Sequence, residues 1–217
     1  MKILLLDTCG ATGSIALASD GKVKAERVLA ERSAAATLQP ALREMLAEQG
    51  VTLAEMDAIA VVTGPGSFTG VRIGVSAAKG LSVGAGVPVI AVSRLAVLAQ
   101  RCEGERVHAV LDAGRREFYM GSYAGELREA MLRREELMAL IAAKPGTVCV
   151  CEAKVVESLK DLKPMMVAEP KAADALMLAM AAWESKEFAD VARLDANYLR
   201  RAEVEMLEKQ REAAARR

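Results

Sequence analysis

The stretch VVTGPGSFTGVRIG, residues 61–74, joins an apolar strand, a glycine-rich turn and the start of a helix. Gly64 and Gly66 permit a backbone with positive φ, and the proline between them stiffens the turn. Ser67 or Thr69 can cap the helix that follows, and exposed amides at such a helix start attract anions. The stretch therefore indicates an α/β fold with a turn built like a phosphate-binding loop.

The residues after this turn do not complete a Walker phosphate loop. That loop needs Lys and then Ser or Thr after its last glycine, whereas Gly70 is followed by Val71 and Arg72. The motif thus resembles a phosphate cradle without specifying a Walker nucleotidase.

The helix expected over about residues 69–85 carries small residues on one face. They recur at every fourth position, at Gly70, Gly74, Ala78 and Ser82. A glycine inside a helix costs about 1 kcal/mol relative to alanine, so the close approach of another segment must offset it. That segment is either the protein's own core or a partner protein, and the spacing leaves both open. Arg72, Ser76 and Lys79 mark a polar side of the same helix.

Strands and helices alternate on both sides of the motif. We expect strands at 2–7, 14–19, 23–28, 57–63 and 87–92, and helices at about 33–49, 69–85 and 93–102. Asp20-Gly21 is a strong hairpin signal between the second and third strands. Leu38, Leu42 and Met45 follow helical spacing in the first helix.

The second half of the chain repeats this order of elements. Residues 108–114 (HAVLDAG) resemble residues 4–10 (LLLDTCG), since each is an apolar strand that ends in Asp before a turn. Three strands and then helices follow in both halves, which favours duplication over chance similarity. We therefore expect two α/β lobes, residues 1–104 and 105–200, and a charged helical tail at 201–217.

Few residues are candidates for catalysis. Asp7 and Asp112 close the matching strands, where they could hold a metal–nucleotide, act as acid and base, or cap their turns. His108 is the only histidine in the chain, so the sequence contains no paired-histidine zinc motif. A Ser–His–Asp triad would have to use this residue from within an expected strand.

Composition narrows the class of protein. Acidic and basic residues balance at 29 each, so the chain lacks a broad basic footprint for nucleic acid. Aromatic residues make up only 3%, which disfavours base-stacking surfaces. No apolar run is long enough for a membrane span or a signal peptide. We expect a globular cytoplasmic protein without membrane contact, in which all four cysteines are reduced core thiols.

Five segments carry a resemblance to a known family: MKILLLDT (1–8), GPGSFTGVRIG (64–74), VPVIAVSRLAVLA (87–99), DAGRREFY (112–119) and NYLR (197–200). Together they resemble the TsaB (YeaZ) family, bacterial proteins needed to make threonylcarbamoyladenosine in transfer RNA. The resemblance runs from about residue 1 to residue 200, and GPGSFTGVRIG after an apolar strand is its most specific part.

The resemblance implies an actin-like (ASKHA, ribonuclease H-like) α/β fold of two stacked lobes, each with a mixed sheet and helices. It also implies a subunit that is not itself an enzyme. TsaB proteins are paralogues of the catalytic TsaD (Kae1-type) transferase and pair with it through helices. The catalytic relatives carry an HxxxH metal motif after the strand that corresponds to VPVIAV, and its two positions are Arg94 and Leu98 here. We therefore expect the metal site of the transferase to be absent.

From the resemblance we expect this chain to activate a TsaD-like subunit in the threonylcarbamoyl modification of adenosine 37 in ANN-decoding tRNAs. A TsaE-like ATPase would join the larger complex, tRNA would be reached only through that complex, and the isolated chain would form a homodimer. The expected partner-interface residues lie on two helices: Leu38, Leu42, Met45, Gly70, Arg72, Gly74, Ser76, Ala78 and Lys79.

A nucleotide would face residues at the two strand ends and the glycine turn, namely Asp7, Thr8, Gly64, Gly66 and Asp112. However, Cys151-Glu152-Ala153 replaces the glycine-containing turn that is usual in the family, and a carboxylate there repels phosphate. We expect no cofactor or metal on this chain alone, with ATP or ADP at the partner interface.

Two other functions are considered on the same fold. An autonomous ASKHA-type ATPase or sugar kinase would need ATP turnover that depends on Asp7 and Asp112, and the sequence shows no second glycine-rich phosphate turn. The glycoprotease activity once attached to this superfamily would need metal-ligand histidines, which the sequence lacks.

Overall fold

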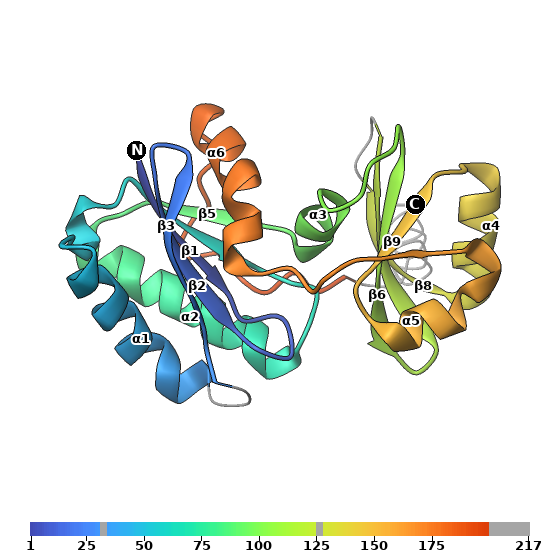
Figure 1. The fold of residues 1–217 in the computed structure, drawn as a ribbon, viewed down its shortest axis with the longest axis horizontal. Coiled ribbons are helices and arrows are strands. Elements are labelled where there is room, and N and C mark those ends of the chain that lie inside the picture. The colour runs from blue at the N-terminus through green and yellow to red at the C-terminus, as the bar shows by residue number, and fades with distance from the viewer. Residues whose placement is uncertain (31–33, 125–127, 200–217) are drawn as a thin grey trace, which may run out of the picture. The chain divides into compact units, whose positions relative to one another are not determined.

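The computed structural model describes residues 1–30, 34–124 and 128–199 (Figure 1). These residues contain two five-stranded sheets, each flanked by helices. None of the helices in this part has both the length and the apolar surface that a bilayer crossing requires. The predicted helical tail at 201–217 lies outside the described residues.

The chain divides into two compact units, and the first of them is discontinuous. It contains Met1–Val97 and Glu169–Asn197, whereas Leu98–Ala168 belong to the second unit. This division differs from the consecutive lobes 1–104 and 105–200 that the repeat suggested. The returning segment belongs to the first unit because its small apolar residues pack on that sheet and the Ala172 amide donates to Ser14 Oγ at 2.8 Å.

The first unit is built on a mixed sheet of order β3-β2-β1-β4-β5. Its strands are β1 (Lys2–Asp7), β2 (Ser14–Ser19), β3 (Lys22–Val28), β4 (Ala58–Val62) and β5 (Val89–Val92). Strand β2 pairs antiparallel with both β1 and β3, whereas β4 pairs parallel with both β1 and β5. Its helical elements are α1 (Ala34–Glu48), η1 (Leu53–Glu55), α2 (Phe68–Ala85), η3 (Ala172–Ala175) and α6 (Leu176–Glu184). Helices α1 and α2 cover one face of the sheet, and α6 lies on the other (Figure 1).

The second unit repeats the same topology, after α3 (Arg94–Ala99). Its sheet has the order β10-β9-β6-β7-β8, formed by β6 (Val107–Gly114), β7 (Glu117–Tyr123), β8 (Arg128–Arg133), β9 (Thr147–Val150) and β10 (Met165–Met166). Its helical elements are α4 (Arg134–Ala143), α5 (Ala153–Ser158) and η2 (Lys160–Leu162). In both sheets the third, second and first strands are antiparallel and the fourth and fifth are added in parallel. The duplication and the actin-like, ribonuclease H-like fold class are confirmed.

Local signals in the sequence place several turns correctly. Asp20 and Gly21 both have positive φ, at 53° and 71°, as the hairpin prediction requires. Ser67 caps α2 by accepting a hydrogen bond from the Gly70 amide at 3.2 Å. The capping box before η1 also forms, since the Thr52 amide donates to Glu55 Oε2 at 2.7 Å.

The small-residue row of α2 faces the protein's own sheet. Gly70, Gly74 and Ala78 are buried, and a Cβ atom at position 74 would lie 2.5 Å from Thr8 Oγ1. At position 70 a Cβ atom would overlap the Thr8 carbonyl oxygen. The prediction that these three residues form a partner interface is therefore wrong, because the close approach they permit is made by the end of β1.

The predicted interface residues of α1 are also interior. Leu38, Leu42 and Met45 are at most 3% exposed and belong to the apolar core of the first unit. Burying side chains of this size contributes roughly 1.5–3 kcal/mol each, which accounts for their helical spacing without any partner. The prediction that these three residues form a partner interface is therefore wrong, and they belong to the core.

The cysteines are not all free thiols. Cys102 and Cys149 form a disulfide within the second unit, while Cys9 and Cys151 are free and buried. The expectation of four reduced thiols is thus wrong for one pair. The segment after α3 and strand β9 bring the two Cα atoms to 6.2 Å, a normal separation for a disulfide.

We predict opposite effects for two glycine-to-alanine changes in α2. Gly74→Ala should lower the free energy of unfolding by about 1–3 kcal/mol, because its methyl group crowds Thr8 Oγ1, which is held by a 2.6 Å hydrogen bond to Gly70 O. Gly80→Ala should raise it by up to about 1 kcal/mol, because a Cβ atom there meets nothing within 4 Å. Urea unfolding of both variants measures this difference. A gain of stability at both positions would contradict the tight contact between α2 and β1.

Candidate functional site

The glycine turn before α2 closes tightly on the end of β1. Gly64 has φ of 101°, a conformation that favours glycine. Gly66 is needed for a different reason, since a Cβ atom there would lie 2.5 Å from the Cys9 carbonyl oxygen. The two glycines therefore serve a compact junction between β4, α2 and the segment after β1.

Several backbone amides of this junction donate hydrogen bonds within the protein. The Ser67 amide donates to Cys9 O at 2.9 Å, and the amides of Gly70 and Val71 donate to Ser67 Oγ and Ser67 O. A phosphate cradle needs such amides free to point at the anion. The turn thus has the backbone pattern of a phosphate loop, but its hydrogen bonds hold the fold together.

A buried arginine lies beneath the turn. The guanidinium of Arg94 donates from Nη1 to Cys9 O at 3.2 Å and from Nη2 to Glu169 Oε1 at 2.7 Å. Its side chain is only 6% exposed. A Cβ atom added at Gly66 or at Gly10 would lie 3.0–3.1 Å from this group, so both glycines make room for it. Glu169, from the returning segment, neutralises its charge.

The predicted nucleotide-facing residues of the first unit are interior and bonded. Asp7 is 3% exposed and accepts a hydrogen bond from the Cys9 amide at 2.8 Å. Burial raises the pKa of Asp7 above its ordinary value of 3.8, an effect that the Arg94 guanidinium and the Cys9 hydrogen bonds partly offset. Thr8 is 2% exposed, and its hydroxyl donates to Gly70 O at 2.6 Å.

The matching aspartate of the second unit, Asp112, also has partners within the protein. Asp112 Oδ2 lies 2.7 Å from Lys154 Nζ, and the Asp112 amide donates to Glu152 Oε2 at 2.7 Å. The Glu152 carboxylate therefore occupies a backbone donor that a bound anion could otherwise use. Asp7 and Asp112 belong to different units, and each is held by contacts within its own.

The sequence prediction identified the outward side of α2 only in part. Arg72 and Ser76 lie on it as expected, but Phe68 and Val83, 69% and 78% exposed, were missed. The Arg72 guanidinium lies 3.3 Å from the centre of the Phe68 ring and donates to Phe68 O at 3.1 Å. This cation–π contact fixes an aromatic ring at the surface.

Two further glycines lie on this outward side. Gly80 and Gly84 are exposed, and a Cβ atom at either position would meet no atom of the described part of the chain within 4 Å. With Ser76 they form a second row of small residues at every fourth position. We call Phe68, Arg72, Ser76, Gly80, Val83 and Gly84 the outer face of α2.

Lys79 borders this face and is tied to the returning segment. Its Nζ donates to Leu194 O at 3.0 Å and to Ala192 O at 3.3 Å. A small pocket of about 270 Å³ lies at this edge, between α2 and residues 192–195. Lys79 thus anchors the end of the first unit beside the outer face.

The two positions that the sequence analysis compared with an HxxxH motif carry groups that do not suit a metal ion. Arg94 has donors only, and Leu98 is a fully buried hydrocarbon. Across the described ranges, no three His, Cys, Asp or Glu side chains gather in a way that could hold a metal ion.

Comparison with known proteins identifies close relatives. The family model described as TsaD, tRNA N6-adenosine threonylcarbamoyltransferase, matches residues 28–160. The tRNA threonylcarbamoyladenosine biosynthesis protein TsaB of Escherichia coli K12 is 40% identical over 147 residues, which cover 62% of this chain and 64% of that protein. The TsaB protein of Bacillus subtilis 168 is 36% identical over 126 residues, which cover 57% of this chain and 55% of that one. The matched part thus spans less than two thirds of these curated relatives.

Solved structures extend the similarity over nearly the whole chain. YeaZ from Pseudomonas aeruginosa has a TM-score of 0.76 and 35% sequence identity, and the match covers 91% of this chain and 99% of that one. A second structure, of an uncharacterized Pseudomonas aeruginosa protein with similarity to peptidase YEAZ, has a TM-score of 0.77 at the same identity.

Replacing Asp7 tests the buried carboxylate. A carboxyl whose pKa is raised by folding stabilises the fold below its unfolded pKa, and this contribution is lost as pH rises through its folded pKa. Asp7→Asn keeps the oxygen that accepts from the Cys9 amide, so the variant should gain stability relative to the original protein as pH rises from 3.8. Urea unfolding of both proteins over a pH series gives this difference curve. A flat curve would show that folding leaves the pKa of Asp7 unshifted, and a curve of the opposite slope would show that the fold stabilises the Asp7 anion; either result contradicts this prediction.

Proposed function

The chain belongs to the TsaB (YeaZ) family, and on that premise we propose that it serves tRNA threonylcarbamoyladenosine biosynthesis as a non-catalytic subunit. It pairs with a TsaD-type transferase subunit and activates it for threonylcarbamoyl transfer to adenosine 37 of ANN-decoding tRNAs. Arg94, which stands where catalytic relatives carry a metal-ligand histidine, supports the non-catalytic role because a guanidinium cannot coordinate a cation.

The observation that carries the proposal is the pair of open glycines on the outer face of α2. Glycine within a helix costs about 1 kcal/mol relative to alanine. At Gly74 the contact with Thr8 accounts for that cost, but no contact with the described residues does so at Gly80 or Gly84. Small residues at every fourth position let a second helix approach closely, so a partner helix explains both.

The rest of the outer face suits a protein partner. Phe68 and Val83 are exposed apolar side chains about 22 Å apart along the helix, given a rise of 1.5 Å per residue. Arg72 holds the Phe68 ring in place before any partner binds, which lowers the entropy lost on association. Aromatic and arginine side chains of this kind are enriched among residues that dominate binding energy.

The same face accounts for the homodimer that we propose, and the larger complex brings the remaining partners. Without the transferase subunit, a second copy of this chain covers it and forms a homodimer. In the complete assembly a TsaE-like ATPase joins the pair, ATP or ADP is held at the partner interface, and tRNA reaches the reaction through the complex. The assembly works in the cytoplasm.

A bulky substitution on the outer face should weaken pairing without unfolding the chain. Gly80→Leu adds a good helix former where space is open, so its melting temperature should match or exceed that of the original protein. Its affinity for the TsaD-type subunit, measured by calorimetry, should fall at least tenfold, which is about 1.4 kcal/mol. Modified adenosine in a reconstituted reaction should fall in parallel. Ala142→Leu, at an exposed position of α4, is the matched control and should change neither quantity.

Two results would contradict this proposal. Gly80→Leu that still pairs with the transferase subunit at the original affinity would remove the outer face from the interface. Normal modification of tRNA by a mixture that lacks this chain would remove the activating role.

A further inference from the structure

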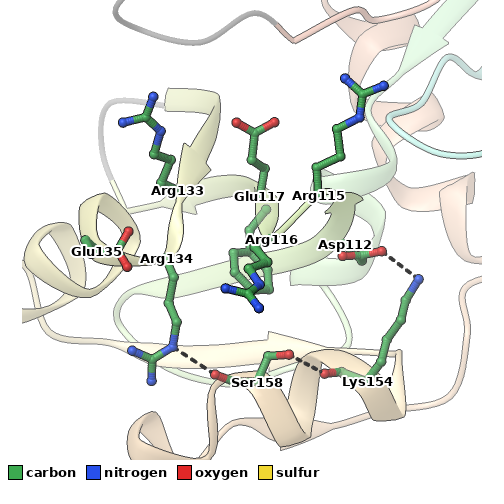
Figure 2. A pocket seen from close by; sticks show the side chains of 10 residues that line it. Asp112, Arg115, Arg116, Glu117, Arg133, Arg134, Glu135, Lys154 and Ser158 are labelled. Carbon is green, nitrogen blue, oxygen red and sulfur yellow. Dashed lines mark hydrogen bonds and ion pairs between the residues drawn. The ribbon is translucent and has the colours of Figure 1, made fainter.

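The second unit contains a strongly charged pocket that the proposed pairing leaves unused. It has a volume of about 660 Å³ and lies between the β6–β7 hairpin, the start of α4 and α5 (Figure 2). Five cationic and three acidic side chains line it, together with Phe118 and Ser158. The cationic residues are Arg115, Arg116, Arg133, Arg134 and Lys154. The balanced charge of the whole chain thus conceals a local basic site.

Two of these cations are unpaired among the residues that the structure describes. Arg134 is paired with Asp161 at 2.7 Å and Lys154 with Asp112 at 2.7 Å. Arg115 and Arg116 are exposed, and within the described residues neither guanidinium makes a hydrogen bond or an ion pair. Figure 2 shows Arg116 pointing into the gap that Arg134 and Lys154 also border. An anion in this gap would meet the positive charge of Arg116, which no described carboxylate neutralises.

The backbone of the hairpin is an independent indication. Arg115 and Arg116 are the two residues between β6 and β7, and their φ angles are 53° and 64°. Turns of this type prefer Asn-Gly, since side chains such as arginine disfavour the left-handed region. Arginine at both positions therefore opposes local stability, and such strained residues gather where a ligand is bound.

The lining also indicates which part of a ligand is recognised. Phe118, the aromatic residue that lines the pocket, is only 4% exposed and cannot stack on a base. The remaining groups are ionic or hydroxylic, and a guanidinium matches the oxygens of a phosphate with two parallel hydrogen bonds. The exposed carboxylate of Glu135 at the start of α4 restricts where the anion can sit. The pocket therefore suits the phosphate group of a nucleotide and offers no surface that would contact the base.

We propose that this pocket binds the sugar–phosphate backbone of the tRNA directly, through Arg115 and Arg116. The proposal rests on the proposed function for the choice of tRNA. It gives the second unit a task that the outer face of α2 does not perform. Phosphate contacts of this kind position a nucleic acid without reading its sequence.

The test removes both guanidinium groups with residues that the turn prefers. Arg115→Asn combined with Arg116→Gly should keep or raise the melting temperature, because Asn-Gly is favoured in this turn. Arg115→Lys combined with Arg116→Lys is the matched control that keeps the charge. Binding of an unmodified ANN-decoding tRNA transcript to the full chain is followed by fluorescence anisotropy over a salt series. Pairing with the TsaD-type subunit is measured in parallel.

We expect the original chain to bind the transcript with a dissociation constant between about 10⁻⁴ and 10⁻⁶ M. The Asn-Gly variant should bind at least about tenfold more weakly, and its plot of log affinity against log salt should be shallower by about 1.4 to 1.8, as for two lost phosphate contacts. The lysine control should keep most of the affinity for the transcript and most of its salt dependence. Pairing should be the same for all three proteins.

Other outcomes overturn the proposal in recognisable ways. Unchanged tRNA binding by the Asn-Gly variant, or no binding by the original chain, removes the RNA site while the proposed pairing stands. Loss of pairing in this variant assigns the pocket to an acidic segment of the protein partner. Loss of ATP or inorganic phosphate binding, with tRNA binding intact, assigns it to a small phosphate ligand. If the original chain does not pair with the TsaD-type subunit but its tRNA binding still depends on the two arginines, this inference stands and the proposed function is refuted.

Discussion

The close approach of α2 to the end of β1 is the contact on which the first unit depends. Thr8 donates its hydroxyl to Gly70 O, while its backbone oxygen lies where a side chain at position 70 would have to be. Only glycine at positions 70 and 74 allows this geometry. The contact fixes the rotation of the helix about its axis, and so it decides which residues of α2 reach the surface.

Helix α2 carries two rows of small residues, one buried and one exposed. The inner row, Gly70, Gly74, Ala78 and Ser82, is buried against the protein itself. The outer row, Ser76, Gly80 and Gly84, is exposed, and among the residues that the structure describes no contact requires glycine at position 80 or 84. The glycines of this row lower the helix propensity of α2, a cost that a covering helix would offset, and this links the packing of the unit to the pairing that we propose. The basic pocket of the second unit is a separate surface with separate chemistry.

Much of the fold could be predicted from the sequence because its signals are local. The alternation of apolar runs, the Asp20-Gly21 turn and the Ser67 cap act over a few residues, and the repeated strand ending in Asp reveals the duplication. The orientation of α2 could not be predicted in this way, since both small-residue rows have the same spacing. In the structure the contacts of Thr8, 62 residues away from Gly70, select the inner row. The Arg94–Glu169 pair and the Cys102–Cys149 disulfide likewise join residues distant in the chain, 75 and 47 positions apart.

The most direct test compares how fast thiols introduced on the two sides of α2 are alkylated. Ser76→Cys places a thiol on the outer face, whereas Ser82→Cys places one on the buried row. In the chain alone the thiol at position 76 should react rapidly and the thiol at position 82 slowly. Addition of the TsaD-type subunit should protect position 76 and leave position 82 unchanged. Equal reactivity at both positions in the free chain, or no protection of position 76 in the complex, would contradict the account.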